Sequence, residues 1–345
     1  MTKNTSYKSF LRENRSKEQS IEIYEQRLVD SSEVFKKFSS TFFYRNCPVC
    51  GGNEANEEEK FNGEYVVVRC DRCRSLYVNP TPCKEALDYY YNRCECNKQF
   101  GKLLKSRVGH KSIILSERTK FVLAIVERLL EQKSEIRVLE VGSNSGAFLY
   151  ELKQALITAK MSTQVCLVGI DIDKSAVNNP VSDDIELHHS SAEDFVEKTT
   201  DRFDLILHFE LIEHLNDPFG FCVSLRHLLE KNGLMYFHTP NGLGLDNQAL
   251  SYNDFRPLAH GIFPPMHLNA FTTQNVAHFL LRAGFGVLNV ETPGNFDVDI
   301  VRQFAEKNSP YAFIQDIEDE NFLAQLQHTL RLVNGSSHMA VLAKL

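Results

Sequence analysis

From residue 135 onward, short runs of β-branched and aliphatic residues alternate with longer segments whose apolar positions recur at helical spacing. Such runs predict buried strands, and their alternation with helices is typical of a parallel sheet that helices cover. Strands are predicted at 136–141, 165–171, 185–189, 203–209, 233–239, 286–291 and 337–344. Helices are predicted at 146–160, 217–231 and 272–283, the last with Thr272 or Thr273 as its cap and Gly284 at its end. The pattern therefore predicts an α/β fold with a doubly wound, mostly parallel seven-stranded sheet.

The chain ahead of this unit follows another pattern. It holds a polar N-terminal stretch with one amphipathic run at 21–28, then short extended segments with turns, and then a helical pattern over 112–132. The extended segments predict a β-hairpin between two turns. The expected parts are an N-terminal appendage at 1–40, a small ribbon at 41–82, a helical linker region at 83–134, and a main domain at 135–345 with an insertion of one polar loop and one helix at 296–335.

Seven of the nine cysteines fall between residues 47 and 96. Four of them form two CxxC pairs, Cys47 with Cys50 and Cys70 with Cys73, with 19 residues between the pairs. Two such turns can complete a tetrahedron of thiolates with no open position, which is a structural zinc site. The alternative, four unrelated buried cysteines, does not account for the paired spacing. The other five lack this spacing and are expected to be plain thiols: Cys83, Cys94, Cys96, Cys166 and Cys222.

Composition limits the partners of the chain. The 345 residues include 45 acidic and 38 basic side chains, a formal net charge of −7, which disfavours nucleic-acid binding through overall charge. No run of 18 apolar residues is present, so we expect no membrane span. Residues 1–15 are polar without an apolar core, so we expect no secretion signal and a cytoplasmic protein whose thiols stay reduced.

A glycine loop follows the first strand of the main domain. Glu140 precedes Gly142 and Gly146, and the next acid at a strand end, Asp171, lies 25 residues past Gly146. A dinucleotide-binding fingerprint needs a third glycine and an earlier acid, so the sequence gives only weak support to a loop that binds the pyrophosphate of a dinucleotide. The order of these motifs instead resembles the class I S-adenosylmethionine-dependent methyltransferases, Rossmann-like enzymes, over about residues 110–292.

That resemblance implies a cofactor site along the carboxyl ends of the strands. The glycine loop would pass under the methionine part of the cofactor, with Glu140 orienting its amino group and Asp171 accepting both ribose hydroxyls. The turn after the third strand would hold the adenine, and Phe209 would lie beside the reacting centre. The implied cofactor-binding residues are Glu140, Gly142, Ser143, Asn144, Gly146, Asp171, Ile172, Ser191, Ala192, Glu193 and Phe209.

Acids and a histidine follow the fourth strand. If 210–214 forms one helical turn, Glu210 faces Glu213 and His214, and His267 returns to the same rim after the fifth strand. ExxEH with a later histidine is similar to two groups of metal-assisted O-methyltransferases, those of ubiquinone synthesis and those that methylate the terminal ribose of small RNAs. The likeness implies a divalent cation such as magnesium on Glu210, Glu213, His214 and His267. In the alternative, Glu213 and His214 are structural, and His267 alone is a general base.

We therefore expect His267 first, and then Glu210 and His214, to act in catalysis. Five other histidines have no comparable partner spacing and are expected at the surface or in satisfied buried positions. They are His188, His189, His208, His238 and His278.

Together, the ribbon and the main domain resemble zinc-binding methyltransferases of deoxysugar and surface-polysaccharide synthesis over about residues 45–292. The C-methyltransferases of that group carry Tyr-x-Glu-His, where this chain has Pro264 and Met266 before His267, and they continue into a further C-terminal domain. We therefore expect methylation of a small molecule, a sugar or nucleotide-linked sugar, on oxygen rather than carbon. The alternatives are an RNA methyltransferase with a zinc ribbon and a non-catalytic cofactor-binding scaffold. The sequence makes no prediction of oligomeric state.

Overall fold

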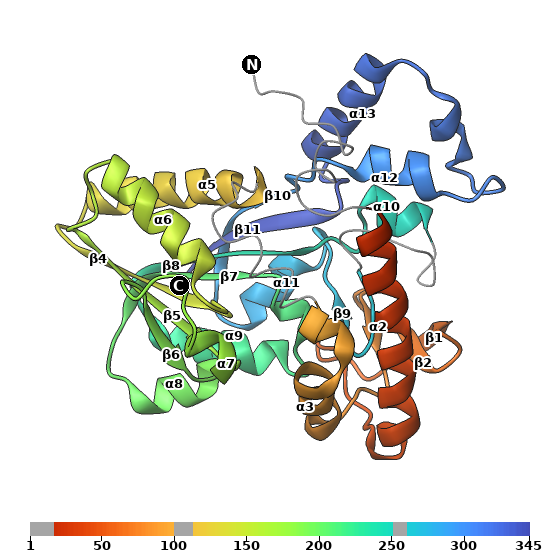
Figure 1. Cartoon of the computed structure of the whole chain (residues 1–345), viewed down its shortest axis with the longest axis horizontal. Helices are drawn as coiled ribbons and strands as arrows, with labels where there is room; N and C mark the ends of the chain where they lie inside the picture. The colour runs from red at the N-terminus through yellow and green to blue at the C-terminus, as the bar shows by residue number, and fades with distance from the viewer. Residues whose placement is uncertain (1–16, 100–112, 251–260) are drawn as a thin grey trace.

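A computed structural model describes residues 17–99, 113–250 and 261–345 (Figure 1). Its larger unit is a seven-stranded sheet with the order β10-β11-β8-β7-β4-β5-β6, in which β11 runs antiparallel to both neighbours and the other pairs are parallel. The predicted doubly wound, mostly parallel sheet is therefore confirmed. The strands are β4 (Ile136–Val141), β5 (Val165–Asp171), β6 (Glu186–His189), β7 (Phe203–Phe209), β8 (Leu229–Pro240), β10 (Gly286–Glu291) and β11 (His338–Lys344).

Helices cover both faces of this sheet because its central strands, β4 and β7, are buried along almost their whole length. On one face α5 (Ile113–Leu130) and α6 (Ala147–Thr158) pack on Val138 and Leu205. On the other face α8 (Ala192–Lys198), α9 (Pro218–Leu228) and α11 (Val276–Arg282) pack on Leu139 and Ile206. The short α7 (Lys174–Val177) follows β5. No helix among the described residues is long and apolar enough to cross a bilayer.

Two predicted helix boundaries are wrong. The helix predicted at 217–231 ends at Leu228, because Leu229 is already extended and pairs with Phe203 of β7, so β8 begins four residues before the predicted strand. The helix predicted from 272 is assigned only from Val276. Thr272 and Asn275 first exchange reciprocal hydrogen bonds of 2.9 and 3.2 Å, which form a separate turn before the helix.

The cysteine region forms a second, four-stranded sheet with the order β1-β2-β3-β9. The predicted hairpin is β1 (Ala55–Phe61) and β2 (Tyr65–Cys70), followed by β3 (Leu76–Val78) and the helix α3 (Lys84–Arg93). The fourth strand, β9 (Asn269–Ala270), comes from the main unit and pairs with Leu76 and Tyr77. The ribbon and the main unit therefore share one sheet.

A long helix packs on this ribbon. The helix α2 (Lys17–Phe38) extends well beyond the amphipathic run at 21–28, and Figure 1 shows it alongside the ribbon. Ser31 in this helix donates to the carbonyl of Pro264 at 2.8 Å and accepts at its own carbonyl from Tyr65 at 2.9 Å. The helix therefore joins the ribbon to the segment that precedes His267.

The segment 296–335 holds more structure than the one loop and one helix that we expected. It forms α12 (Asp297–Phe304), a 3₁₀ helix (Ala312–Asp316) and α13 (Glu320–Leu332). These elements share a separate apolar core with the region of α10 (Leu245–Ala249), through Leu250, Val301 and Leu323 among others. In Figure 1 they form a lobe beyond one end of the sheet.

Candidate active site at the carboxyl edge of the sheet

The glycine loop lies across the ends of the first two strands. The backbone N–H groups of Gly142 and Ser143 donate to the carbonyl of Ile170 in β5 at 2.9 and 3.1 Å. Gly169 permits this approach, because a Cβ there would lie 2.6 Å from the Ser143 hydroxyl. Gly146 then starts α6 with a φ of 79°, a conformation that a residue with a side chain rarely adopts.

Asp171 is fixed at the end of β5 by two backbone groups. Its Oδ2 accepts from the N–H of Asn144 and its Oδ1 from the N–H of Asp173, both at 2.7 Å. Burial raises the pKa of Asp171, and the two N–H groups oppose that rise. A carboxylate has about four acceptor positions, so two bonds leave capacity for hydroxyl donors.

The turn after β6 lies beside Asp171, since the N–H of Ser190 donates to the Asp171 carbonyl at 3.0 Å. Ser191 caps α8 through a 3.1 Å bond from the N–H of Asp194, Ala192 is buried, and Glu193 is exposed. Ile172 is 67% exposed just after β5, so this edge presents an apolar side chain to solvent. These predicted residues therefore share one edge.

Phe209 ends β7 at the same edge. Its ring packs edge-on against Phe148 at 4.7 Å between centroids, and the guanidinium of Arg118 lies 4.8 Å from its centroid. The predicted residue thus has its ring held from two sides, by α6 and by α5.

The buried groups under the loop fit a cationic, polar ligand. Oε2 of Glu140 and Oγ of Ser143 are both buried and have no hydrogen-bond partner among the described residues. Burial raises the pKa of Glu140 to about 8. Buried polar atoms are normally bonded, so these two require partners that the described residues do not supply. An amino group and a sulfonium would provide a donor and a positive charge at this place.

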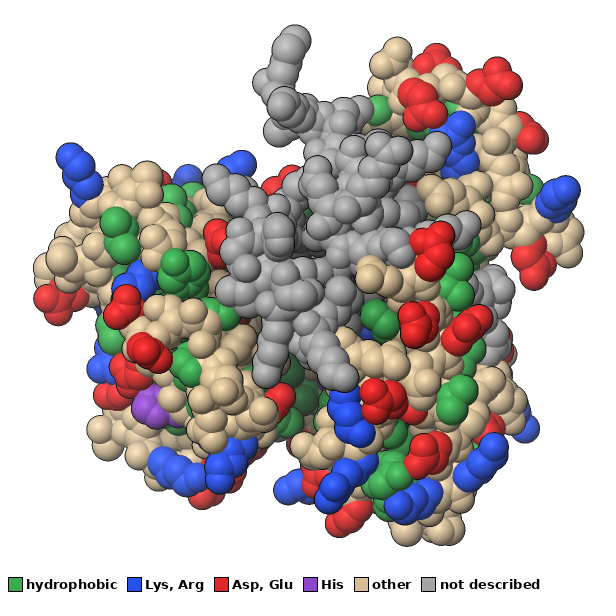
Figure 2. Space-filling view, in the orientation of Figure 1, with side chains coloured by type: hydrophobic (Ala, Val, Ile, Leu, Met, Phe, Trp, Pro, Cys, Tyr) green, Lys and Arg blue, Asp and Glu red, His purple; other side chains and the backbone are tan. Residues whose placement is uncertain are grey.

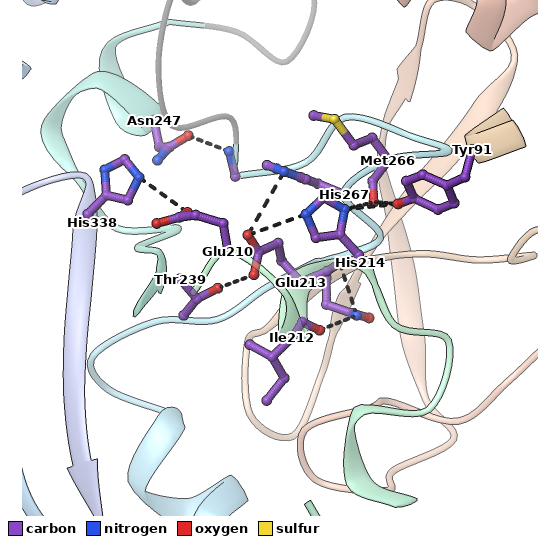
Figure 3. Close-up of polar contacts among 12 residues, drawn as sticks. Tyr91, Glu210, Ile212, Glu213, His214, Thr239, Asn247, Met266, His267 and His338 are labelled. Atoms are coloured by element: carbon purple, nitrogen blue, oxygen red, sulfur yellow. Dashed lines mark hydrogen bonds and ion pairs between the residues drawn. The ribbon is translucent and has the colours of Figure 1, made fainter. Parts of the chain in front are cut away.

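A second group of polar side chains forms around Glu213, which is fully buried. Its Oε1 lies 3.7 Å from Nε2 of His214 and 4.0 Å from Nε2 of His267, and its Oε2 accepts from Thr239 at 2.9 Å (Figure 3). One atom from each of Glu213, His214 and His267 lies within 4.8 Å of the others. Nitrogen and oxygen atoms that each lie about 2.0–2.2 Å from one ion are separated from one another by distances comparable to those among these three side chains. The three residues could therefore hold one cation.

The tautomer of His214 suits a ligand. Its Nδ1 lies 2.9 Å from the carbonyl of Met266, which can only accept, so Nδ1 carries the hydrogen and Nε2 keeps its lone pair. The hydroxyl of Tyr91 lies 3.0 Å from the same Nδ1. Burial lowers the pKa of His214 to about 4, which keeps the ring neutral near pH 7. Burial, followed by the charge of Glu210, raises the pKa of Glu213 well above its ordinary value, so a cation would displace a proton there.

Glu210 lies outside this group, and the predicted helical turn is wrong. Residue 210 has a φ of 51°, and the turn is a 3₁₀ helix at Ile212–His214, so the i, i+3 and i+4 positions do not share a face. Figure 3 shows Glu210 turned toward His338, which lies 3.4 Å from its carboxylate. Arg118 donates to the other oxygen at 2.5 Å. Burial raises the pKa of Glu210, but His338 and Arg118 outweigh burial and lower it below its usual range.

The four ribbon cysteines converge as their spacing predicted. The sulfur of Cys47 lies 3.5 Å from that of Cys73, and Cys50 and Cys70 are separated equally, with all four atoms within 4.8 Å of one another. Sulfurs at 2.3 Å from a tetrahedral zinc would be separated by about 3.8 Å, which matches this cluster. In the described part of the chain, the other five cysteines join no such group.

Three side chains at this edge escaped sequence reasoning: Tyr91, Arg118 and His338. Tyr91 contacts His214, 123 positions away, and Arg118 contacts Glu210, 92 positions away. No local pattern signals a partner at such a distance.

Curated relatives match the middle of the chain. The ubiquinone biosynthesis O-methyltransferase of Actinobacillus pleuropneumoniae serotype 5b (strain L20) is 31% identical over 112 residues, which cover 30% of this chain and 46% of that protein. The protein of the same name from Histophilus somni (strain 2336) is 27% identical over 124 residues, 34% of this chain and 51% of that protein. The chain spans about half the length of the curated relatives it matches.

Solved structures also resemble this chain. A SAM-dependent methyltransferase from Archaeoglobus fulgidus has a TM-score of 0.43 and 16% identity, covering 71% of this chain and 100% of that chain. The plantazolicin methyltransferase BamL, solved with a triazolic desmethylPZN analog and SAH, has a TM-score of 0.48 and 15% identity, covering 74% of this chain and 93% of that chain.

A family model described as a methyltransferase domain matches residues 114–290, slightly more than half of the chain. This range holds β4 to β9, all of β10 but its last residue, and every residue of the edge described above except Tyr91 and His338; the ribbon cysteines also lie outside it. The resemblance to class I S-adenosylmethionine-dependent methyltransferases is thereby confirmed. The chain belongs to the methyltransferase-domain family.

Proposed function

We propose that this protein transfers a methyl group from S-adenosylmethionine to a hydroxyl of a small-molecule acceptor, with a divalent cation on Glu213, His214 and His267. The observation that carries the proposal is the convergence of these three side chains beside the carboxyl edge of a methyltransferase-domain sheet. The curated relatives named as ubiquinone biosynthesis O-methyltransferases support oxygen as the methylated atom.

The cofactor residues of the proposal are those at the ends of β4 to β7. Asp171 would accept from the ribose hydroxyls, Glu140 and Ser143 would meet the amino-acid part, and Ile172 with the Ser191-Ala192-Glu193 turn would border the adenine. Bound S-adenosylmethionine supplies an electrophilic methyl on a positively charged sulfur. The loop, which is held against Ile170, would orient the bound cofactor, and Phe209 would lie beside the reacting centre.

The acceptor side of the reaction requires removal of a proton. A divalent cation supplies charge that lowers the pKa of a nearby hydroxyl. Glu213 and His214 would hold such an ion, since Thr239 fixes one carboxylate oxygen and Met266 fixes the imidazole tautomer. His267 would either complete the ligand set or accept the hydroxyl proton as the methyl–sulfur bond breaks and the methyl–oxygen bond forms. Glu210 would act indirectly, through its pairing with Arg118 and His338.

A sugar or nucleotide-linked sugar remains our proposal for the acceptor, and it rests on the likeness of the ribbon and main domain to deoxysugar methyltransferases. The RNA alternative receives little support from the one face of the molecule that Figure 2 shows. On the face in Figure 2, the described Lys and Arg side chains are interspersed with Asp and Glu. We further propose that Cys47, Cys50, Cys70 and Cys73 bind one structural zinc, because their sulfurs match its geometry.

The test is a methyl-transfer assay with a panel of hydroxyl acceptors that includes nucleotide-linked sugars and phenols. Activity should fall when loosely bound cations are chelated and return with Mg²⁺ or Mn²⁺, while the ribbon zinc is monitored separately. Glu213→Gln and His267→Ala should each lower turnover by roughly 100-fold or more and leave S-adenosylmethionine affinity unchanged. His188→Gln is the matched control, because His188 pairs with Glu186 at the surface. If turnover does not depend on added cation but is lost in His267→Ala, then His267 acts as a general base and the proposed cation has no part in the mechanism.

A further inference from the structure

The ribbon contacts both histidine-bearing segments of the proposed site through one side chain. Arg45 lies two residues before Cys47, and its guanidinium donates to the carbonyl of Asn216 at 2.7 Å and to the carbonyl of Leu268 at 3.2 Å. His214 is two residues before Asn216, and His267 is the residue before Leu268. Arg45 therefore bridges the two segments that carry the histidines.

The remaining bonds of this guanidinium strengthen the bridge. Arg45 also donates to the side-chain oxygen of Asn269 at 2.8 Å and to the carbonyl of Val78 at 3.5 Å. All four acceptors are uncharged oxygens, so the planar fork of the guanidinium serves to join backbone segments. A lysine has a single nitrogen and could not reach all of these acceptors together.

Asn269 extends the same contact to the turn that contains Glu213. Its side-chain amide donates to the carbonyl of Leu215 at 2.8 Å and lies 3.3 Å from that of Glu213. The N–H of Leu268 also donates to the Glu213 carbonyl at 2.8 Å. The segments are thus bonded to each other as well as to the ribbon.

We propose that Arg45 is a positioning residue that sets the distance between His214 and His267, so that the cysteine ribbon determines the geometry of the acceptor site. This inference rests on the proposed function of the two histidines. Arg45 itself touches neither imidazole in the contacts described, and it acts through Asn216, Leu268 and Asn269.

The test compares Arg45→Lys with Arg282→Lys in the full chain. Arg282 also joins the ribbon to the main unit, through the carbonyl of Val49, and it lies over the ring of Phe219, but among the described residues it donates to no carbonyl of 214–216 or 267–269. Arg45→Lys should weaken Mn²⁺ binding, followed by electron paramagnetic resonance, by at least tenfold. S-adenosylmethionine affinity and ribbon zinc should stay within twofold of wild type, and Arg282→Lys should leave all three unchanged.

Ring-nitrogen NMR spectra of His214 and His267 provide a readout that needs neither cation nor acceptor. Both signals should move in Arg45→Lys and in Asn269→Ser, and neither should move in Arg282→Lys. If the wild type binds no Mn²⁺, the proposed cation site fails, and the ring spectra still decide the role of Arg45. Unchanged ring signals in both variants with native zinc content would overturn the inference, as would equal shifts in the Arg282 control. Asn269→Ser serves if Arg45→Lys does not fold.

Discussion

The carboxylate of Asp171 accepts a hydrogen bond from the backbone N–H of Asn144 at 2.7 Å, which ties the end of β5 to the glycine loop. Replacing it should therefore damage the cofactor site in two ways, because both a ribose acceptor and a loop anchor are lost. We expect Asp171→Ala to weaken S-adenosylmethionine binding by roughly 10- to 100-fold in a calorimetric titration.

Asp173→Ala is the matched control for that variant. Asp173, two residues after Asp171, caps α7 by accepting from the backbone N–H groups of Ser175 and Ala176. Its loss should cost about 1 kcal/mol of stability and leave cofactor affinity within roughly threefold of wild type. Equal losses of affinity in the two variants would mean that the turn as a whole, not the Asp171 carboxylate, matters for binding.

Cys70→Ser should remove the metal from the ribbon. A tetrahedral thiolate site that loses one ligand binds zinc far less tightly, and the ribbon depends on that binding to fold. Zinc analysis of the purified protein should give about one ion per chain for the wild type and well below one for the variant. Cys166→Ser, which changes an exposed cysteine on β5, should keep its zinc; a wild-type protein without zinc would refute the site.

Glu140 should make the stability of the folded protein depend on pH. Its folded pKa of about 8 lies above the ordinary value of 4.5, so between these values the folded state holds a proton that the unfolded state releases. Stability from this group is therefore complete below about pH 4.5 and is lost as the pH rises toward 8, by at most about 1.4 kcal/mol per pH unit.

Urea unfolding between pH 5 and 8 measures this effect. The difference in unfolding free energy between Glu140→Gln and the wild type should grow in favour of the variant as the pH rises, since glutamine cannot ionise. Gln154→Ala on α6, which removes no ionisable group, should run parallel to the wild type over the same range. A pH-independent difference for Glu140→Gln would show that the carboxyl is ionised throughout.

His208 departs from the expectation that it would be satisfied if buried. It is fully buried on β7, stacks on Phe237 at 4.5 Å, and neither ring nitrogen has a hydrogen-bond partner among the described residues. We expect His208→Leu to raise the unfolding free energy at pH 7 by about 1–2 kcal/mol, because the unpaired polar ring is removed. A loss of stability would indicate a buried water on the ring.

Lower pH should increase the difference in unfolding free energy between His208→Leu and the wild type. Burial lowers the pKa of His208 to about 3, so between pH 6.5 and 3 the unfolded chain takes up a proton that the folded chain refuses. The wild type therefore loses stability from this group as the pH falls through that range, and the variant does not. Unfolding curves at pH 5 and 7 for both proteins give the comparison.

The strands were predictable because each is a short run of mostly β-branched and aliphatic residues with its own local signal. The segments 136–141, 165–171, 203–209 and 286–291 match the structure at both ends. The cysteine site was predictable for a related reason, since two CxxC turns carry four ligands at fixed short spacing. In both cases the information lies within a few neighbouring residues.

The polar side chains at the carboxyl edge of the sheet were harder to predict, because their arrangement depends on one backbone angle and on partners that are distant in sequence. The positive φ at Glu210 turns its carboxylate toward Arg118 and away from Glu213, and nothing in the letters Phe-Glu-Leu-Ile-Glu-His indicates that angle. Arg45 reaches Leu268 across 223 positions, and Tyr91 reaches His214 across 123. Such pairs become visible only when the topology is known.

The pairing of β3 with β9 has a consequence for how this chain is made. The strand that contains Leu76, β3, can pair with β9 only after Ala270 has been synthesised. The outer edge of β3 therefore stays unpaired while almost 200 residues are added to the chain. Contacts of this sequence separation form slowly, and an uncovered strand edge can pair with another chain in the meantime. Ribosome-bound chains that end before residue 269 should therefore depend on chaperones more than longer chains do. In a fragment of residues 41–82, the same edge of β3 would stay unpaired.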